Sequence, residues 1–177
     1  MQYTNSYRSP LGPITLASDG ERLTGLWFDG QKYFAAILSQ EAVDTPLPVF
    51  DQTKRWLDYY FRGENPAFMP PLAPQGSSFR QVVWGILRQI PYGTVMTYGN
   101  IAKQIARQRG LETMSAQAVG GAVAHNPISI MIPCHRVVGQ HGSLTGYAGG
   151  IDKKVQLLTL EKVDLQSFFV PKKGSAL

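Results

Sequence analysis

The fold is decided by a proline-rich stretch, residues 63–78, which reads GENPAFMPPLAPQGSS. Its four prolines and two glycines oppose a regular helix or interior strand, because proline lacks a backbone N–H and glycine is conformationally free. We therefore place a domain boundary in this linker. The sequence predicts an N-terminal domain over residues 1–76, a C-terminal domain over residues 77–163 and a tail over residues 164–177.

The part of the chain before the linker is predicted to form a small sheet with one helix. Apolar runs separated by turn-forming residues indicate three antiparallel strands, over residues 3–7, 14–17 and 23–28. Apolar side chains at helical spacing then indicate a helix over residues 49–61, which ends before Gly63. Because the apolar face of this helix must be covered, we expect it to pack on the sheet, which gives an α+β fold.

The part after the linker is predicted to be mainly helical. Apolar stripes and capping residues indicate four helices: residues 79–87 with Ser78 as N-cap, a second begun by Thr97, residues 116–124 with Ser115 as N-cap, and residues 151–161. The second and third of these form either a helix-turn-helix, which reads nucleic acid, or an ordinary helical core.

The connecting segments of this part carry three further expectations. Residues 128–133 form an apolar run that indicates a buried strand. Residues 139–150 contain five glycines, which indicates either a mobile rim or a surface held by a ligand. In the tail, Phe168 and Phe169 are expected to dock, and the end from Pro171 onward is expected to fray.

The helix over residues 116–124 contains an unusual pair of glycines. We expect Ala116, Val119, Ala122 and Val123 to face inward. Gly120 and Gly121 lie in the middle of the helix, where each costs about 1 kcal/mol relative to alanine. Close approach of another helix or close approach of a large ligand, such as a nucleic-acid backbone, would offset that cost.

Charge and hydropathy limit the classes of function. Residues 1–78 hold six Lys/Arg against eight Asp/Glu, whereas residues 79–162 hold nine against three, within a net charge of +5. This asymmetry indicates either a polyanionic partner or an ordinary basic surface. No apolar run approaches the ~20 residues that span a bilayer, and no leader pattern is visible. We therefore expect a cytoplasmic protein with no membrane partner.

Cys134 is the single cysteine, followed directly by His135 and Arg136. One cysteine excludes an internal disulfide and a cysteine-rich zinc site, and we expect no metal and no cofactor. A thiol becomes a nucleophile when a base takes its proton and a third group orients that base. Glu161 lies in an apolar run, so it is the acidic residue expected to point inward toward such a base. The alternative is a buried and inert cysteine.

The residues around Cys134 match a larger pattern. They read IPCHRVVG over residues 132–139, and further motifs are IPYGTVMTYG at 90–99, AVGGA at 118–122, GYAGG at 146–150 and the pair Asn126-Pro127. Together with the helix that ends at Glu161, these motifs resemble the O6-alkylguanine-DNA alkyltransferases across the whole second half of the chain. Residues 1–76 match that family only in size and in the order of strands and helix.

The resemblance implies a fold and an activity. The implied fold is a ribonuclease H-like N-terminal domain followed by a helix-turn-helix domain that carries the active-site cysteine. The implied activity is DNA repair by direct reversal: the protein flips an O6-alkylated guanine out of duplex DNA and moves the alkyl group, irreversibly and once per molecule, onto Cys134. Duplex DNA would be bound through its minor groove by a protein that is a monomer in the absence of DNA.

The resemblance also implies roles for individual residues. His135 would take the thiol proton through a water molecule, Glu161 would orient the imidazole, Asn126 would brace the active-site region, and Tyr98 would hydrogen-bond the flipped guanine. The implied substrate pocket contains Val123, Val137, Tyr147 and Ala148. The implied DNA contacts are Thr97, Ala116, Gln117, Gly120 and Arg136. Close approach of DNA then becomes the favoured reason for the glycine pair.

Two departures from the family pattern affect the DNA contacts. The best-studied members carry an arginine where this sequence has Gln117, and a basic residue where it has Ala124. Glutamine is shorter and uncharged but still donates hydrogen bonds, so we expect DNA affinity to depend less on this side chain. Three rival functions are a lesion binder that does not repair, a thiol hydrolase with turnover, and a helix-turn-helix regulator. Cys134 speaks against the first of these.

Overall fold

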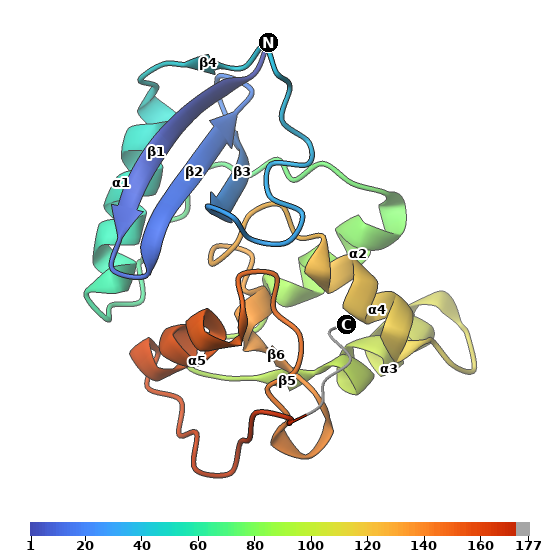
Figure 1. Ribbon diagram of the computed structural model, residues 1–177. Coiled ribbons are helices and arrows are strands. Elements are labelled where there is room, and N and C mark those ends of the chain that lie inside the picture. The colour runs from blue at the N-terminus through green and yellow to red at the C-terminus, as the bar shows by residue number, and fades with distance from the viewer. Residues whose placement is uncertain (173–177) are drawn as a thin grey trace. The chain divides into compact units, whose positions relative to one another are not determined.

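The computed structural model describes residues 1–172, which form two compact units (Figure 1). Unit 1 comprises Met1–Gln75 and Pro127–Ser129, and unit 2 comprises Gly76–Asn126 and the chain from Ile130 onward. The predicted α+β fold class, with an N-terminal antiparallel sheet, a covering helix and a mainly helical C-terminal part, is confirmed. None of the helices within residues 1–172 is long and apolar enough to cross a membrane.

Unit 1 is built on a four-stranded sheet in the order β3-β2-β1-β4. Its strands are β1 (Tyr3–Ser9), β2 (Gly12–Ser18), β3 (Leu23–Phe28) and β4 (Val43–Asp44). The first three form the predicted antiparallel meander. The fourth strand, parallel to β1, was not predicted, because two exposed residues carry no hydrophobic alternation.

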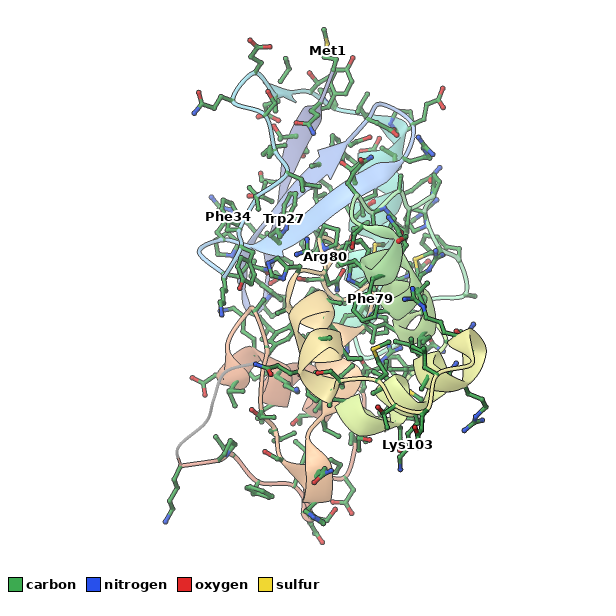
Figure 2. The ribbon with its side chains drawn as sticks, turned by 90° about the vertical axis from the view of Figure 1, so that its right-hand side faces the viewer. Met1, Trp27, Phe34, Phe79, Arg80 and Lys103 are labelled. Atoms are coloured by element: carbon green, nitrogen blue, oxygen red, sulfur yellow. The ribbon has the colours of Figure 1, made fainter. Side chains whose placement is uncertain are left out.

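One helix, α1 (Pro48–Phe61), packs against this sheet as expected. Proline at its first position fits there because that N–H has no partner within a helix. The side chains that it buries are Val49, Phe50, Thr53, Trp56, Leu57 and Tyr60. The ring of Trp27, in β3, meets edge to face the ring of Phe34, which follows that strand, with the centroids 6.3 Å apart; both residues are labelled in Figure 2.

The predicted strand over residues 128–133 is wrong. Leu26 of β3 receives a hydrogen bond from the Ser129 N–H (2.9 Å) and donates its own N–H to Pro127 (2.8 Å), so three residues join unit 1 beside β3. Ile130 then has a φ of +69°, which ends the extended backbone. An apolar run therefore indicated burial correctly but not backbone conformation.

Unit 2 contains four helices: α2 (Ser78–Leu87), α3 (Tyr98–Arg109), α4 (Ala116–Ala124) and α5 (Ile151–Leu160). It also contains two short parallel strands, β5 (Met96–Thr97) and β6 (Val137–Val138), and two 3₁₀ turns, η1 (Cys134–Arg136) and η2 (Gln140–Gly142). The helices α2, α3 and α4 pack against one another, and α5 packs against η1. This packing places the turn that carries the cysteine beside the last helix.

The predicted helix starts are nearly all correct. The Thr97 hydroxyl accepts from the Asn100 N–H (3.0 Å), and the Ser115 hydroxyl accepts from the Ala118 N–H (3.2 Å). The N-cap of α2 is Ser77 rather than Ser78, because it is the Ser77 hydroxyl that receives the Arg80 N–H. Two adjacent serines offer the same capping group, and only the backbone angles distinguish them.

The inner face of α4 differs from the prediction at one residue. Val119, Ala122 and Val123 are buried as expected, but Ala116 is exposed in the first turn of the helix. The inner face is fixed by a neighbouring side chain, since the indole Nε1 of Trp84 donates to the Ala122 carbonyl at 2.9 Å.

The glycine-rich segment over residues 139–150 is held by the chain itself, so neither a mobile rim nor a ligand is needed to explain it. Leu144 is buried beside Val138 and Leu158, and its N–H donates to the Phe169 carbonyl at 2.8 Å. Phe168 packs against the same cluster. The expected docking is thus confirmed for Phe168, whereas Phe169 is attached only through its backbone and its side chain is half exposed. The expected frayed end lies mostly outside the described residues.

Candidate active site

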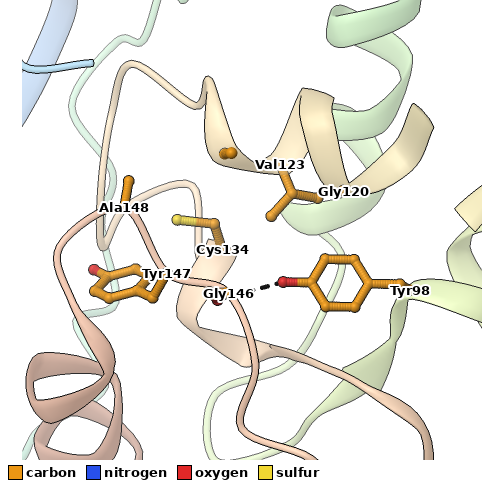
Figure 3. A pocket seen from close by; sticks show the side chains of 8 residues that line it. Tyr98, Gly120, Val123, Cys134, Gly146, Tyr147 and Ala148 are labelled. Atoms are coloured by element: carbon orange, nitrogen blue, oxygen red, sulfur yellow. Dashed lines mark hydrogen bonds between the residues drawn. The ribbon is translucent and has the colours of Figure 1, made fainter. Parts of the chain in front are cut away.

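The single thiol lies in a small pocket of unit 2 (Figure 3). The pocket is lined by Tyr98, Gly120, Val123, Ala124, Cys134, Gly146, Tyr147 and Ala148. In Figure 3 the Cys134 sulfur points to the side on which Ala148 lies, away from Val123. The volume open to the centre of a water molecule is about 10 Å³, which accommodates about one water. A purine can therefore enter only after the walls of the pocket move apart.

Glu161 organises the charged groups behind the thiol. Its Oε2 accepts from His135 Nε2, and its Oε1 accepts from Arg136 Nε (2.8 Å) and from the Gly93 N–H (3.0 Å). His135 is 0% exposed and Glu161 is 2% exposed. Buried charges are tolerated only when they are paired and hydrogen-bonded, and this carboxylate has three donors. The charged cluster is therefore fully hydrogen-bonded within the chain.

The protonation states of the pair follow from their surroundings. Burial raises the pKa of Glu161, but the hydrogen bonds and charges of His135 and Arg136 outweigh it and lower the pKa to about 2. Burial lowers the pKa of His135 below its ordinary value, against the opposing effect of Glu161. At neutral pH the carboxylate is therefore ionised and the imidazole neutral. With Nε2–H donated to Glu161, Nδ1 is the basic nitrogen.

Opposing influences act on the Cys134 thiol. Burial raises its pKa, and this effect is opposed by a hydrogen bond from Asn126, the positive charge of Lys154 and the backbone N–H groups of Cys134 and His135. The thiol is therefore protonated at rest and needs a base. The same hydrogen bonds and the same positive charge stabilise the thiolate once it forms, because each favours the negatively charged form of the sulfur. Asn126 is itself held by a hydrogen bond from its Nδ2 to the Ile132 carbonyl at 2.7 Å.

Arg136, for which a DNA contact was predicted, has a side chain that is held inside the site. Its side chain is 11% exposed, its Nε donates to Glu161, and its Nη1 donates to the Ile90 carbonyl at 2.8 Å. These bonds give Arg136 an internal role, in which it joins His135 in lowering the pKa of Glu161, and its predicted DNA contact stays a prediction. A tight turn that buries both basic side chains is not visible in the sequence Cys134-His135-Arg136.

The residues predicted for the pocket fall into two groups. Val123, Tyr147 and Ala148 line the cavity, together with Tyr98, which was expected to bind the guanine. The Tyr98 hydroxyl donates to the Gly146 carbonyl at 3.3 Å (Figure 3) and to the Thr145 carbonyl, also at 3.3 Å. Burial raises its pKa, and so does the negative charge that Cys134 carries when it is a thiolate, so the hydroxyl remains a donor. Val137 instead lies behind the pocket in β6, fully buried.

The residues predicted for DNA contact lie mainly on α4. Ala116 and Gln117 are exposed in its first turn, whereas Gly120 is buried and forms part of the pocket wall. Thr97 caps α3. An added Cβ at Gly121 would meet nothing within 4 Å, so close packing of another helix does not explain this glycine.

Sequence reasoning missed Lys154, which is 0% exposed. Its Nζ donates to the carbonyls of Val137, Thr145 and Gly146. Burial lowers its pKa to about 8, against the opposing effect of Cys134. The signal that could have found it is helical spacing: Lys154 precedes Leu157, Leu158 and Glu161 by three, four and seven residues, which places it on the inner face of α5.

Comparison with known proteins assigns the class that this fold and site define. The ribonuclease-like domain of 6-O-methylguanine DNA methyltransferase matches residues 2–74, and the DNA binding domain of 6-O-methylguanine DNA methyltransferase matches residues 78–163. This chain belongs to the 6-O-methylguanine DNA methyltransferase family. The resemblance stated from the motifs is confirmed. It also extends over residues 2–74, where the sequence had matched the family only in size and in the order of strands and helix.

Individual relatives carry the same assignment. The methylated-DNA–protein-cysteine methyltransferase of Haemophilus influenzae is 41% identical over 162 residues, covering 91% of this chain and 87% of that protein. The protein of that name from Mycobacterium tuberculosis is 45% identical over 155 residues, covering 87% and 88%. The crystal structure of Mycobacterium tuberculosis O6-methylguanine methyltransferase superposes with a TM-score of 0.78 at 43% identity, covering 92% and 93%. A crystal structure of the Mycobacterium tuberculosis OGT in complex with DNA superposes with a TM-score of 0.78 at 42% sequence identity, covering 90% of this chain and 92% of that chain.

Proposed function

We propose that this protein repairs DNA by taking the alkyl group of O6-alkylguanine onto Cys134, once per molecule. The observation that carries the proposal is the arrangement behind the sulfur: a neutral imidazole held by an ionised, buried carboxylate, next to the only thiol in the chain. Family membership supports the substrate, because the relatives are named for transfer from methylated DNA to a protein cysteine.

The transfer step balances with the groups present in the pocket. Nδ1 of His135 takes the thiol proton through a water molecule, and the thiolate attacks the alkyl carbon. A sulfur–carbon bond forms as the carbon–oxygen bond to O6 breaks, and the electron pair of that bond stays on the guanine. The proton that left the thiol ends on the guanine. The products are S-alkylcysteine and unmodified guanine, and the thioether offers no easy return.

Stabilisation of the leaving purine is the second requirement. An O6-alkyl carbon is a weak electrophile unless charge developing on the guanine is stabilised in the transition state. We assign this role to the Tyr98 hydroxyl, supported by its place in the pocket wall and its raised pKa. Asn126 braces the turn that carries the sulfur. Val123, Tyr147 and Ala148 enclose the base, and Val137 supports the pocket from behind.

Duplex DNA is the proposed partner, bound through its minor groove by α4 while the protein is a monomer. Extruding a base costs a few kcal/mol, less for a damaged one, so a surface must hold the distorted duplex. The exposed face of α4 is suited to close approach, since Ala116, Gln117 and Gly121 are short or slender. Gly120 and Thr97 would lie at the edges of this contact. A Mycobacterium tuberculosis relative has been crystallised in complex with DNA.

We assign the two activities, DNA binding and alkyl transfer, to residues 77–163, which lie after the linker. Residues 1–76 would act as a supporting domain and residues 164–177 as a tail. We also propose a cytoplasmic location, which family membership among DNA-repair enzymes supports. No metal or cofactor takes part in the proposed step, since the thiol, the imidazole and the substrate supply every bond and proton.

A titration with lesion-bearing DNA tests the proposal. Duplex DNA containing O6-methylguanine is added in excess to a known amount of protein, and the lesions that remain are counted. We expect the number of repaired lesions to equal the number of protein molecules, and Cys134→Ser protein to repair none. Continued repair beyond one lesion per protein would indicate a hydrolase, and no repair by the unaltered protein would overturn the proposal.

A further inference from the structure

The buried lysine of α5 has an unusual set of partners. Lys154 is 0% exposed, and among residues 1–172 it forms no ion pair with a carboxylate. Its ammonium donates instead to three backbone carbonyls: those of Val137, Thr145 (3.0 Å) and Gly146 (3.0 Å). A charge removed from water needs compensation, and here three carbonyl dipoles provide it. Burying a charge in this way lowers the stability of the fold unless the bonds fully compensate, so we expect a functional reason in what the three carbonyls connect.

The three carbonyls belong to two segments of the active site. Val137 follows directly after η1, the turn that carries Cys134. Thr145 and Gly146 come directly before Tyr147 and Ala148, which line the pocket. One ammonium group therefore fastens the turn with the sulfur to the loop that forms the opposite wall.

Tyr98 contacts the same loop from the other side. Its hydroxyl is 3.3 Å from each of the carbonyls of Thr145 and Gly146, farther than the 3.0 Å of the Lys154 bonds to the same two atoms. A hydroxyl has one proton, so it shares that proton between two acceptors. These Tyr98 bonds are therefore the weaker pair, whereas the bonds from the charged ammonium are the stronger.

We propose that Lys154 is a positioning residue that holds the carbonyls of Thr145 and Gly146 in place while the Tyr98 hydroxyl leaves them to bind the guanine. The inference rests on the proposed function. With Lys154 present, the Gly146 carbonyl keeps a donor when Tyr98 turns away, so the exchange is easy. Without Lys154, the tyrosine is retained by the loop, and stabilisation of the leaving purine is lost together with the wall geometry.

The test measures single-turnover methyl transfer from O6-methylguanine in duplex DNA over a range of DNA concentrations. Lys154→Met removes the ammonium at nearly constant length, and Lys153→Met makes the same change one residue earlier on α5. We expect Lys154→Met to lower the maximal rate about tenfold or more while the half-saturating DNA concentration stays within about twofold of the unaltered protein. Lys153→Met should transfer at the unaltered maximal rate. An unchanged maximal rate in Lys154→Met, or a loss confined to DNA affinity, would overturn the inference.

Coupling to Tyr98 separates positioning from a general structural role. Tyr98→Phe is measured in the unaltered protein and in Lys154→Met. We expect the phenylalanine to slow the unaltered protein but to slow Lys154→Met by less than about twofold, because the tyrosine no longer reaches the guanine there. If Tyr98→Phe slowed Lys154→Met by the same factor as the unaltered protein, the proposed movement of the Tyr98 hydroxyl from the loop to the guanine would be contradicted. A general loss of structure would lower the unfolding temperature and the DNA affinity as well.

Lys154→Arg carries the test if the methionine variant does not fold. Its planar fork keeps the charge but does not reproduce three divergent bonds from one nitrogen. We expect the maximal rate of Lys154→Arg to lie between those of the unaltered protein and Tyr98→Phe. We also expect Tyr98→Phe to slow Lys154→Arg by a smaller factor than it slows the unaltered protein. The unaltered rate with the full cost of Tyr98→Phe would refute the inference. Failure of the unaltered protein to transfer methyl would refute the proposed function instead.

Discussion

Two regions of unit 2 differ in the burial and hydrogen bonding of their polar side chains. Behind the sulfur, His135, Lys154 and Glu161 are at most 2% exposed and hydrogen-bonded within the chain. On the outer face of α4, Gln117 and Gly121 are exposed, and the helix contains no charged residue. The comparison shows that the groups around the sulfur are hydrogen-bonded within the chain, whereas the outer face of α4, to which we assign the DNA contact, exposes small uncharged residues.

This difference has a physical basis. A buried charge must be fully paired, so the interior of the site is fixed by the fold and tolerates few substitutions. An exposed face of small residues makes few contacts of its own, so substitutions there act mainly on a bound partner. Changes behind the sulfur should therefore affect chemistry and stability strongly, and changes on α4 should affect DNA binding mildly.

The largest effect is expected at the sulfur itself. Cys134→Ser replaces a thiol by a hydroxyl, whose proton His135 removes far less readily. We expect methyl transfer to fall by at least about a thousandfold while DNA affinity stays within about twofold. Single-turnover assays and DNA-binding titrations measure the two quantities. Substantial transfer by Cys134→Ser would show that another group accepts the methyl.

The next effect tests the group that orients the base. Glu161→Gln removes the negative charge that favours protonation of His135, so the imidazole becomes a weaker base. We expect a loss of about a hundredfold in maximal transfer rate, a similar loss for His135→Asn, and little further loss when both are combined. Losses that multiply in the combined variant would indicate that the two residues act separately.

The same carboxylate predicts a pH dependence of stability. The pKa of Glu161 in the folded protein is about 2, below its ordinary value of 4.5. The folded state therefore holds this proton less tightly than the unfolded state, so the stabilisation is complete above about pH 4.5 and is lost as the pH falls toward 2. Its size is on the order of 3 kcal/mol. The pKa of His135 is also lower in the folded protein than its ordinary value of 6.5. Protonation of His135 therefore also reduces the free energy of unfolding as the pH falls below that value.

Urea unfolding at a series of pH values measures this dependence. The matched control is Glu161→Gln, which should be less stable at neutral pH and should show a flatter profile below pH 4.5. Gln117→Ala on α4 should leave the profile of the unaltered protein unchanged, since no titratable group is altered. Equal slopes for the unaltered protein and Glu161→Gln would contradict the assigned protonation state.

A smaller effect is expected on α4. Gly121→Ala adds a methyl group where nothing lies within 4 Å, so helix propensity should raise the unfolding free energy by up to about 1 kcal/mol. The same methyl group should obstruct DNA and weaken binding several-fold. Gly85→Ala on α2 is the matched control, because its Cβ also meets open space. We expect Gly85→Ala to raise the unfolding free energy as much as Gly121→Ala does, without a change in DNA affinity. Equal DNA affinities in both variants would place the DNA contact elsewhere.

The smallest effect is expected at Gln117. Its side chain is exposed and uncharged, so its removal releases no counterion contact. We expect Gln117→Ala to lower DNA affinity and transfer rate by about threefold or less. Near-complete loss of DNA-dependent transfer, with transfer from free O6-methylguanine base retained, would show that this glutamine has a larger role.

Local signals explain what the sequence could predict. Thr97 and Ser115 were found because a cap acts on residues two or three positions away. The inward direction of Glu161 was found because its neighbours along the helix are apolar. These features depend only on residues near in sequence. The roles of His135 and Tyr98 came from the family resemblance rather than from such local signals.

Signals that depend on distant contacts account for the errors. The bend at Ile130 and the inward turn of Arg136 are fixed by groups far along the chain, such as Leu26 and Glu161. Lys154 was missed because lysine is seldom buried, although its spacing from Leu157 and Leu158 placed it on the inner face. Hydrophobic patterns thus located the buried segments but did not reveal which polar groups were paired within them.

Intact-mass measurement followed by peptide mapping tests the central claim most directly. The protein is incubated with duplex DNA that contains a single O6-methylguanine, and its mass is compared with that of protein kept with unmodified DNA. The account predicts a gain of one methyl group in place of one hydrogen, on every active molecule, located on Cys134. Loss of the lesion without a mass gain, or a methyl group on any other residue, would contradict it.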